Sequence, residues 1–107
     1  MVKIELRQTN GKTKEYTQDF VSGRKLRNVV AFGADTEQGK YKTELEQLDA
    51  MVALVAGIFD DQEVTADAIY DGVEGKSLAD VLANTVEQVM GGIYGTQEGE
   101  VVQDEGK

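Results

Sequence analysis

Apolar and polar residues alternate at the start of the chain in the period-two pattern of a half-buried β-strand, with apolar side chains at Val2, Ile4 and Leu6. Asn10-Gly11 is a strong turn signal, so a return strand is expected to follow. The buried face of that strand is predicted to carry Tyr16, Gln18 and Phe20. This pairing requires a loop with an odd number of residues, three or five, with Gly11 in a left-handed conformation.

The remaining pattern predicts helices. Ser22 is the expected N-cap of a first helix that runs to about Gly33, with one apolar stripe at Leu26, Val29 and Val30. Residues 34–40 form a polar connection. A main helix then begins near Tyr41 or Thr43 and ends at Phe59. Spacings of four and three define its wide stripe of Tyr41, Leu45, Leu48, Val52, Val55 and Phe59, with Met51, Leu54 and Ile58 beside it. A stripe of this width favours a core-facing helix over a coiled-coil seam.

Two further helices complete the predicted domain. Thr65 caps a short helix over residues 66–71, and Ser77 with Asp80 resembles a capping box at the start of the last helix. The buried face of that helix is predicted to be Leu78, Val81, Leu82, Thr85, Val86, Val89 and Met90, and Gly91 with Gly92 is expected to end it. The fold class is therefore α+β: an N-terminal β-hairpin packed on about four α-helices. Residues 1–94 form one domain, and the polar, acidic residues 95–107 are predicted to be a disordered tail.

Composition argues against enzymatic activity. The chain has no His, Cys, Trp or Pro, so it lacks the commonest acid-base group, the thiol nucleophile and the soft metal ligands. The acids Asp60, Asp61, Glu63 and Asp67 lack the spacing of a calcium loop, and are expected instead to favour the N-terminus of the following helix. We therefore predict no catalytic residue, no metal site and no cofactor.

The net charge of -9 is unevenly distributed. Residues 1–42 carry nine Lys and Arg against five acids, and residues 43–107 carry two against fifteen. The basic and acidic residues either keep helical faces solvated or have a role in binding. In the second case the two halves of the chain bind different partners, or two copies pair head to tail. Nucleic acid is not expected as a partner of so acidic a surface, and neither a signal peptide nor an apolar run of membrane-spanning length is present. The expected location is the cytoplasm.

Three short motifs carry a family resemblance. Residues 58–72 read IFDDQEVTADAIYDG, residues 10–12 form the Asn-Gly-Lys turn, and residues 20–24 read FVSGR. In this order and spacing they resemble the tail assembly chaperones of long-tailed phages and prophages of Gram-positive bacteria, over residues 1 to about 93. The resemblance implies a protein that binds the tape measure protein, keeps it soluble in the bacterial host cytoplasm, helps recruit tail tube subunits and is absent from the mature virion. It also implies a longer product made by frameshifting, and a homo-oligomer is a further candidate.

Such a chaperone needs an apolar groove between helices for amphipathic client helices. The expected groove residues are Met51, Leu54, Ile58, Tyr70 and Met90, although each at helical spacing also suits an ordinary core position. Arg24 opposes the macrodipole of its helix, which suggests either a role in binding or a solvated helix start. Two other functions stay open: a structural phage tail subunit that offers strand edges to its neighbours, and an acidic inhibitor that mimics nucleic acid.

Overall fold

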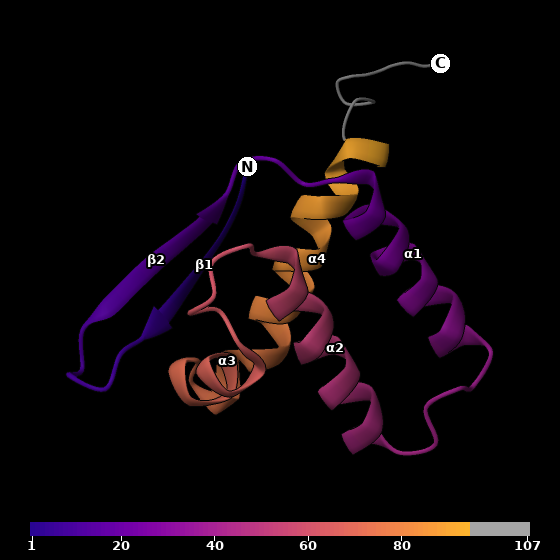
Figure 1. The fold of residues 1–107 in the computed structure, drawn as a ribbon. Coiled ribbons are helices and arrows are strands. Elements are labelled where there is room, and N and C mark those ends of the chain that lie inside the picture. The colour runs from indigo at the N-terminus through magenta and orange to yellow at the C-terminus, as the bar shows by residue number, and fades with distance from the viewer. Residues whose placement is uncertain (95–107) are drawn as a thin grey trace.

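The computed structural model describes residues 1–94, and a β-hairpin followed by helices makes up this part of the chain (Figure 1). Strands β1 (Val2–Arg7) and β2 (Thr13–Gln18) are antiparallel. The helices are α1 (Gly23–Glu37), α2 (Glu44–Ile58), α3 (Ala66–Gly72) and α4 (Leu78–Tyr94), with a short 3-10 helix η1 (Gly75–Ser77) before α4. The predicted α+β class, with its hairpin and four helices, is confirmed. The tail predicted at residues 95–107 lies outside the described residues.

The register of the hairpin follows from its hydrophobic pattern. Ile4 pairs with Tyr16 and Val2 with Gln18, so the loop is the five residues 8–12, and Gly11 has a φ of 84°. Both predictions for this turn are confirmed. Phe20 does not share the buried face, because the strand ends at Gln18 and the Phe20 side chain is 76% exposed. That prediction is wrong.

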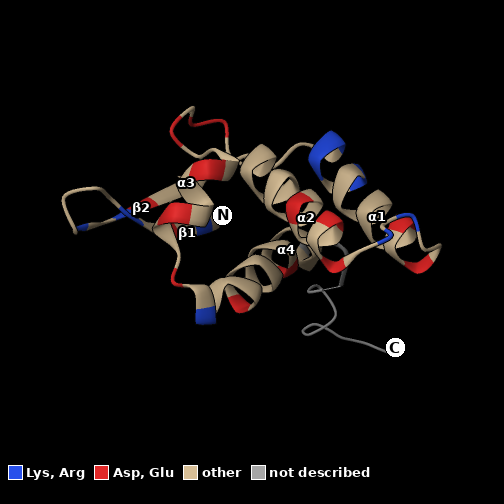
Figure 2. Ribbon diagram, turned by 90° about the horizontal axis from the view of Figure 1, so that it is seen from below, with Lys and Arg blue, Asp and Glu red and all other residues tan. Residues whose placement is uncertain are grey.

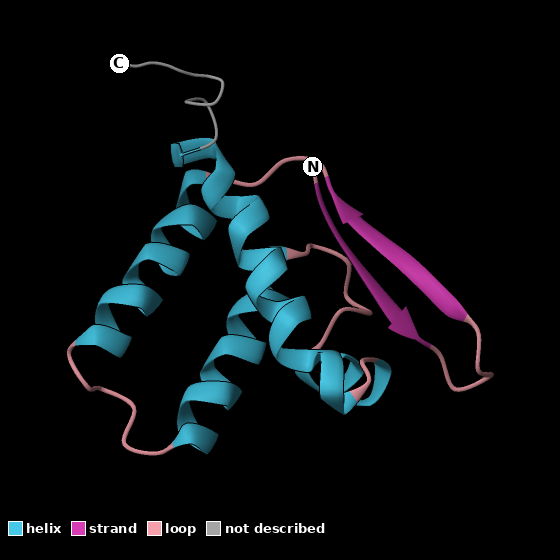
Figure 3. Ribbon diagram, turned by 180° about the vertical axis from the view of Figure 1, so that it is seen from behind, coloured by secondary structure: helices cyan, strands magenta, loops and turns pink. Residues whose placement is uncertain are grey.

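Helix α2 is the centre of the fold. It packs against α1, α3 and α4, while α3 and α4 also pack against β1. The hairpin therefore lies on one side of the helices and α1 on the other, as Figures 1 and 3 show. The core side chains come from both strands, all four α-helices and the segment between α2 and α3: Val2, Ile4, Leu6, Tyr16, Val29, Val52, Val55, Ile58, Phe59, Val64, Ile69, Leu82 and Val89. Thr85 is buried among them, and its hydroxyl donates to the Val81 carbonyl at 2.8 Å.

Hydroxyl side chains cap the first three helices. Ser22 accepts from the Lys25 N–H, Thr43 from the Glu46 N–H and Thr65 from the Ala68 N–H, so each satisfies a backbone donor at a helix start. The predicted caps at Ser22 and Thr65 are confirmed. Ser77 instead ends η1, which continues directly into α4.

The sequence placed two helix ends too early. Helix α1 continues past Gly33 to Glu37, and a left-handed Gly39 with a φ of 75° follows it. Helix α4 continues past Gly91 to Tyr94. A helical glycine costs only about 1 kcal/mol relative to alanine, which packing readily offsets. In α1, the ring of Phe32 lies 5.5 Å from that of Tyr41, and this contact holds the last turns against the chain that leads into α2.

Candidate partner-binding surfaces

An exposed apolar strip runs along α1. Leu26 and Val30 lie one turn apart and, with Gly23 and Ala31, line a shallow hollow of ≈450 Å³ that has Arg27 at its side. Val29 faces the core at 4% exposure, whereas Val30, the next residue, is 48% exposed. Neighbouring helical residues point about 100° apart, and on this helix Val29 points into the core while Val30 points to its edge. We call Gly23, Leu26, Val30 and Ala31 the α1 strip.

The apolar surface continues beyond the start of α1. A second hollow of ≈370 Å³ shares Gly23 and Leu26 with the α1 strip and extends to Met1 and Val21. Met1 is 68% exposed, and the strongly exposed Phe20 directly precedes Val21. Exposed apolar side chains that gather in one region mark an interaction site more often than isolated ones do. This region is therefore a candidate surface for an apolar partner.

The basic residues in the first turn of α1 have different environments. Arg24 is exposed, as expected, and Figure 2 shows the basic end of this helix. Lys25 turns inward, where its ammonium donates to the Ile58 carbonyl at 2.7 Å and pairs with the Asp60 carboxylate at 2.7 Å. The hydrogen bond from Lys25 and a second one from Gln18 lower the pKa of Asp60. Lys25 therefore satisfies a main-chain carbonyl at the end of α2 and links α1 to the end of that helix.

The acidic segment between α2 and α3 is tied to the hairpin. Glu63 accepts from the Tyr16 hydroxyl at 2.7 Å and from the Lys14 ammonium at 2.9 Å. These hydrogen bonds lower the pKa of Glu63, and the Glu63 carboxylate raises the pKa of both Tyr16 and Lys14. The Asp60 carboxylate accepts from the Gln18 side-chain Nε2 at 2.9 Å, and the Gln18 side-chain Oε1 accepts from the Asp60 main-chain N–H at 2.9 Å. Two acids of this segment thus position the hairpin. Within residues 1–94, no cluster of three or more carboxylate side chains forms a candidate metal site.

The five predicted groove residues come from three helices and differ in exposure. Met51 and Leu54 on α2, and Met90 on α4, are half-buried against the core. Tyr70 on α3 is also half-buried, and its hydroxyl donates to the Asp49 carboxylate, which raises the pKa of Tyr70 to about 12. Ile58 is 1% exposed and belongs to the core, so its side chain does not line an open surface. The prediction that Ile58 lies in an exposed groove is wrong, because its side chain packs in the core.

Sequence reasoning did not identify the α1 strip or Phe20 as exposed. Leu26, Val30 and Phe20 were assigned to buried faces, since apolar residues at helical or alternating spacing usually lie there. The spacing of Leu26, Val29 and Val30 is that of an ordinary core-facing stripe, so it carried no signal that Val30 would be exposed. Leu45, at the start of α2, was also placed on a buried stripe and is 65% exposed.

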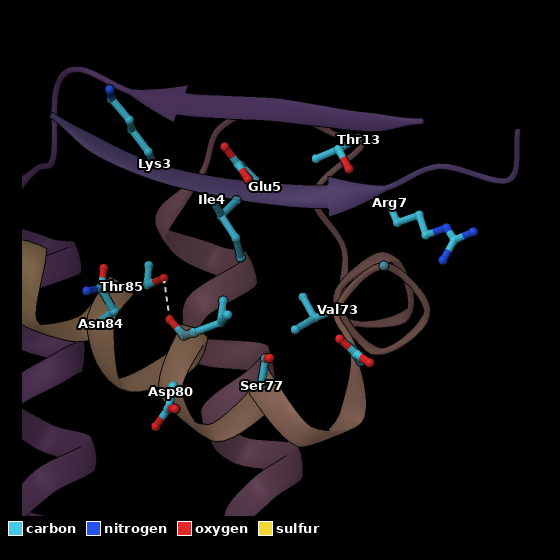
Figure 4. A pocket seen from close by; sticks show the side chains of 13 residues that line it. Lys3, Ile4, Glu5, Arg7, Thr13, Val73, Ser77, Asp80, Asn84 and Thr85 are labelled. Atoms are coloured by element: carbon cyan, nitrogen blue, oxygen red, sulfur yellow. Dashed lines mark hydrogen bonds between the residues drawn. The ribbon is translucent and has the colours of Figure 1, made fainter. Parts of the chain in front are cut away.

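A polar groove of ≈630 Å³ lies on the other side of the molecule, between β1 and the segment from α3 to α4 (Figure 4). Its strand wall consists of Lys3, Ile4, Glu5 and Arg7 of β1 and Thr13 of β2. Its helical wall consists of Gly72, Val73, Glu74, Ser77, Asp80, Val81, Asn84 and Thr85. In the described part of the chain, no helix is both long and apolar enough to cross a bilayer.

A family model described as phage tail chaperone protein matches residues 1–107. No curated protein and no solved structure matches the chain.

Proposed function

The chain belongs to the phage tail chaperone family, and from that premise we propose that it acts during tail assembly by binding the tape measure protein. In this proposal it keeps that client soluble in the cytoplasm of the host, helps recruit tail tube subunits and leaves before the virion is complete. The work is done by binding, so it requires no catalytic residue, metal or cofactor. A frameshift-extended form is proposed as the species that contacts the tail tube subunits.

The α1 strip is the observation that supports this function best. Val30 is 48% exposed, and the hollow around it is lined by apolar or small side chains with one arginine at the side. An amphipathic client helix can place its apolar face on such a surface, and Arg24 and Arg27 can meet acidic residues beside that face. The net charge of -9 helps keep a complex with an apolar client in solution.

Co-expression with the tape measure protein tests the proposal. Wild-type protein is expected to hold the client in the soluble fraction and to co-purify with it. Val30→Glu places a charge in the contact and should reduce co-purification about tenfold, as removal of a central apolar contact commonly does. Leu45→Glu is the matched control, because Leu45 is also exposed but lies at the start of α2, outside the α1 strip. It should leave co-purification unchanged.

Two results count against this function. If Val30→Glu and Leu45→Glu reduced co-purification of the tape measure protein equally, the α1 strip would not be the binding surface. Stoichiometric amounts of the protein in purified virions, measured by mass spectrometry, would instead favour the structural tail subunit. Recruitment of tube subunits is tested separately, by asking whether tube protein joins the purified complex only when the extended form is present.

A further inference from the structure

The outer edge of β1 borders the polar groove. In an antiparallel pair, residues alternate between those that bond to the partner strand and those whose N–H and C=O point away from it. The Gln8 N–H donates to the Lys12 carbonyl at 2.7 Å, which sets the phase so that even-numbered residues of β1 bond to β2. Lys3, Glu5 and Arg7 therefore direct their main-chain groups outward. The Lys3 N–H confirms this phase, because it donates to the Gln88 side chain on α4 at 3.0 Å.

Helices cover the two ends of this edge and leave its middle open. Gln88 occupies the Lys3 end, through the hydrogen bond just described. At the other end, Gly72 lies so close that a Cβ built on it would be 3.1 Å from the Arg7 carbonyl oxygen. Outside the strand ladder, no hydrogen bond among residues 1–94 involves the main chain of Glu5. An unpaired N–H and C=O on a strand edge form a template for another extended segment.

Acidic side chains lie on both walls of the groove, with Glu5 between Lys3 and Arg7 on the strand wall. Glu5 lies directly opposite Glu15 across the hairpin, so two like charges are adjacent. Asp80 lines the facing helical wall, and none of the salt bridges formed by residues 1–94 includes it. A cation beside Glu5 would relieve the repulsion from Glu15, because opposite charges on neighbouring strands stabilise a sheet.

We infer that this groove binds a short extended peptide segment of a partner protein by adding it as a third strand to β1. The central residue of the segment satisfies the N–H and C=O of Glu5 and carries a Lys or Arg side chain beside the Glu5 carboxylate. Side chains alternate across a strand, so the two flanking residues point toward the helices. There they meet Val73 and Val81, and small apolar residues fit. The site is separate from the α1 strip and does not depend on the proposed function.

Titration of the ¹⁵N-labelled full chain with the peptide acetyl-Thr-Val-Lys-Val-Thr-amide tests the inference by NMR. Saturable shifts are expected for the amides of Glu5, Val73 and Val81, and for the Gln88 side-chain amide. Replacing the central Lys of the peptide with Glu should weaken binding about fivefold, the effect of changing an opposite-charge pair into a like-charge pair. N-methylation of the central residue removes a main-chain donor and should abolish the shifts.

Two matched variants distinguish a specific effect of Glu5 at the strand edge from a general effect of negative charge on the hairpin. Glu5→Gln should remove the preference for the Lys peptide, whereas Glu15→Gln makes the same change one strand farther from the groove and should keep most of it. Both side chains are exposed, so both variants are expected to fold. Equal binding of the N-methylated peptide, shifts centred on α1, or no saturable shift at all would overturn the inference.

Discussion

Glu5 on β1 and Glu15 on β2 form a direct cross-strand pair in which both side chains are exposed. Their position in the ladder is a non-hydrogen-bonded one, where facing Cα atoms approach to about 4.5 Å. Like charges at this separation destabilise a hairpin. The neighbouring pairs, Lys3 with Thr17 and Arg7 with Thr13, contain no such conflict.

Glu15→Lys is therefore expected to stabilise the protein by about 0.5 kcal/mol, because it replaces repulsion with attraction across the strands. Urea unfolding measures the free energy of unfolding. Glu15→Gln removes only the repulsion and should give an intermediate gain. The advantage of Glu15→Lys over Glu15→Gln should shrink in about 1 M salt, which screens exposed charges. An advantage that does not depend on salt would show that the gain is not electrostatic.

The hairpin shows what a sequence can specify by itself. Its register follows from the requirement that the even-numbered apolar residues share one face, and Gly11 provides the turn that this register needs. The end of β2 was not predictable in the same way. Gln18 bonds to the Phe20 carbonyl and to Asp60, a residue 42 positions away, and those contacts turn the chain before Phe20 can reach the buried face. Alternation alone carries no information about such a partner.

Gly72 is predicted to resist substitution. A Cβ there would lie 3.1 Å from both the Arg7 carbonyl oxygen and the Leu6 Cβ, and neither atom can move without displacing β1. Gly72→Ala should therefore lower the free energy of unfolding by about 1–2 kcal/mol, even though alanine favours the helix. Thermal or urea unfolding measures the loss. A neutral result would mean that α3 and β1 are less closely packed than the structure shows.

Gly33 provides the opposite case in α1. A Cβ on Gly33 meets nothing within 4 Å, and the helix continues for four residues beyond it. Gly33→Ala should raise the free energy of unfolding by about 0.5–1 kcal/mol through the lower backbone entropy cost of alanine. The sequence suggested that the helix ends here, and in that case alanine would bring no such gain. The same unfolding measurement thus tests the observed extent of α1.

The two faces of α2 predict a further contrast. Val52 is fully buried and Leu45 is 65% exposed, although both belong to the same apolar stripe of the sequence. Val52→Asp should cost several kcal/mol or unfold the protein, because the buried carboxylate has no partner. Leu45→Asp should change the free energy of unfolding by no more than about 0.5 kcal/mol. Circular dichroism with urea titration distinguishes these outcomes, and tolerance of Val52→Asp in a folded monomer would contradict the observed core.

The candidate surfaces were harder to predict than the core. An apolar stripe predicts that a helix packs against other elements of the fold. The positions of those elements decide which residues of the stripe are covered and which stay exposed. For this reason Ile58, which was expected on the exposed groove, is buried, and Val30, which was expected on a buried stripe, is exposed. Ile58 lies where α2 meets the chain leading to α3, while Val30 lies on the flank of the outermost helix. The polar groove depends on the approach of α4 to β1, whose residues Gln88 and Lys3 are 85 positions apart.

The pair of Tyr70 and Asp49 predicts a loss of stability at alkaline pH. The hydrogen bond to Asp49 raises the pKa of Tyr70 to about 12, while an unfolded chain has a tyrosine pKa of about 10. The folded state therefore favours neutral Tyr70. This contribution is fully present below pH 10 and is lost as the pH rises toward 12, because only the unfolded chain ionises over that range. The stability advantage of wild type over Tyr70→Phe, measured by urea unfolding, should fall across this interval.

Asp49→Asn, which removes the charged acceptor, should lower the pKa of Tyr70 toward 10, as followed by the ultraviolet absorbance of ionised tyrosine. An unchanged titration in Asp49→Asn would show that Asp49 does not control the ionisation of Tyr70.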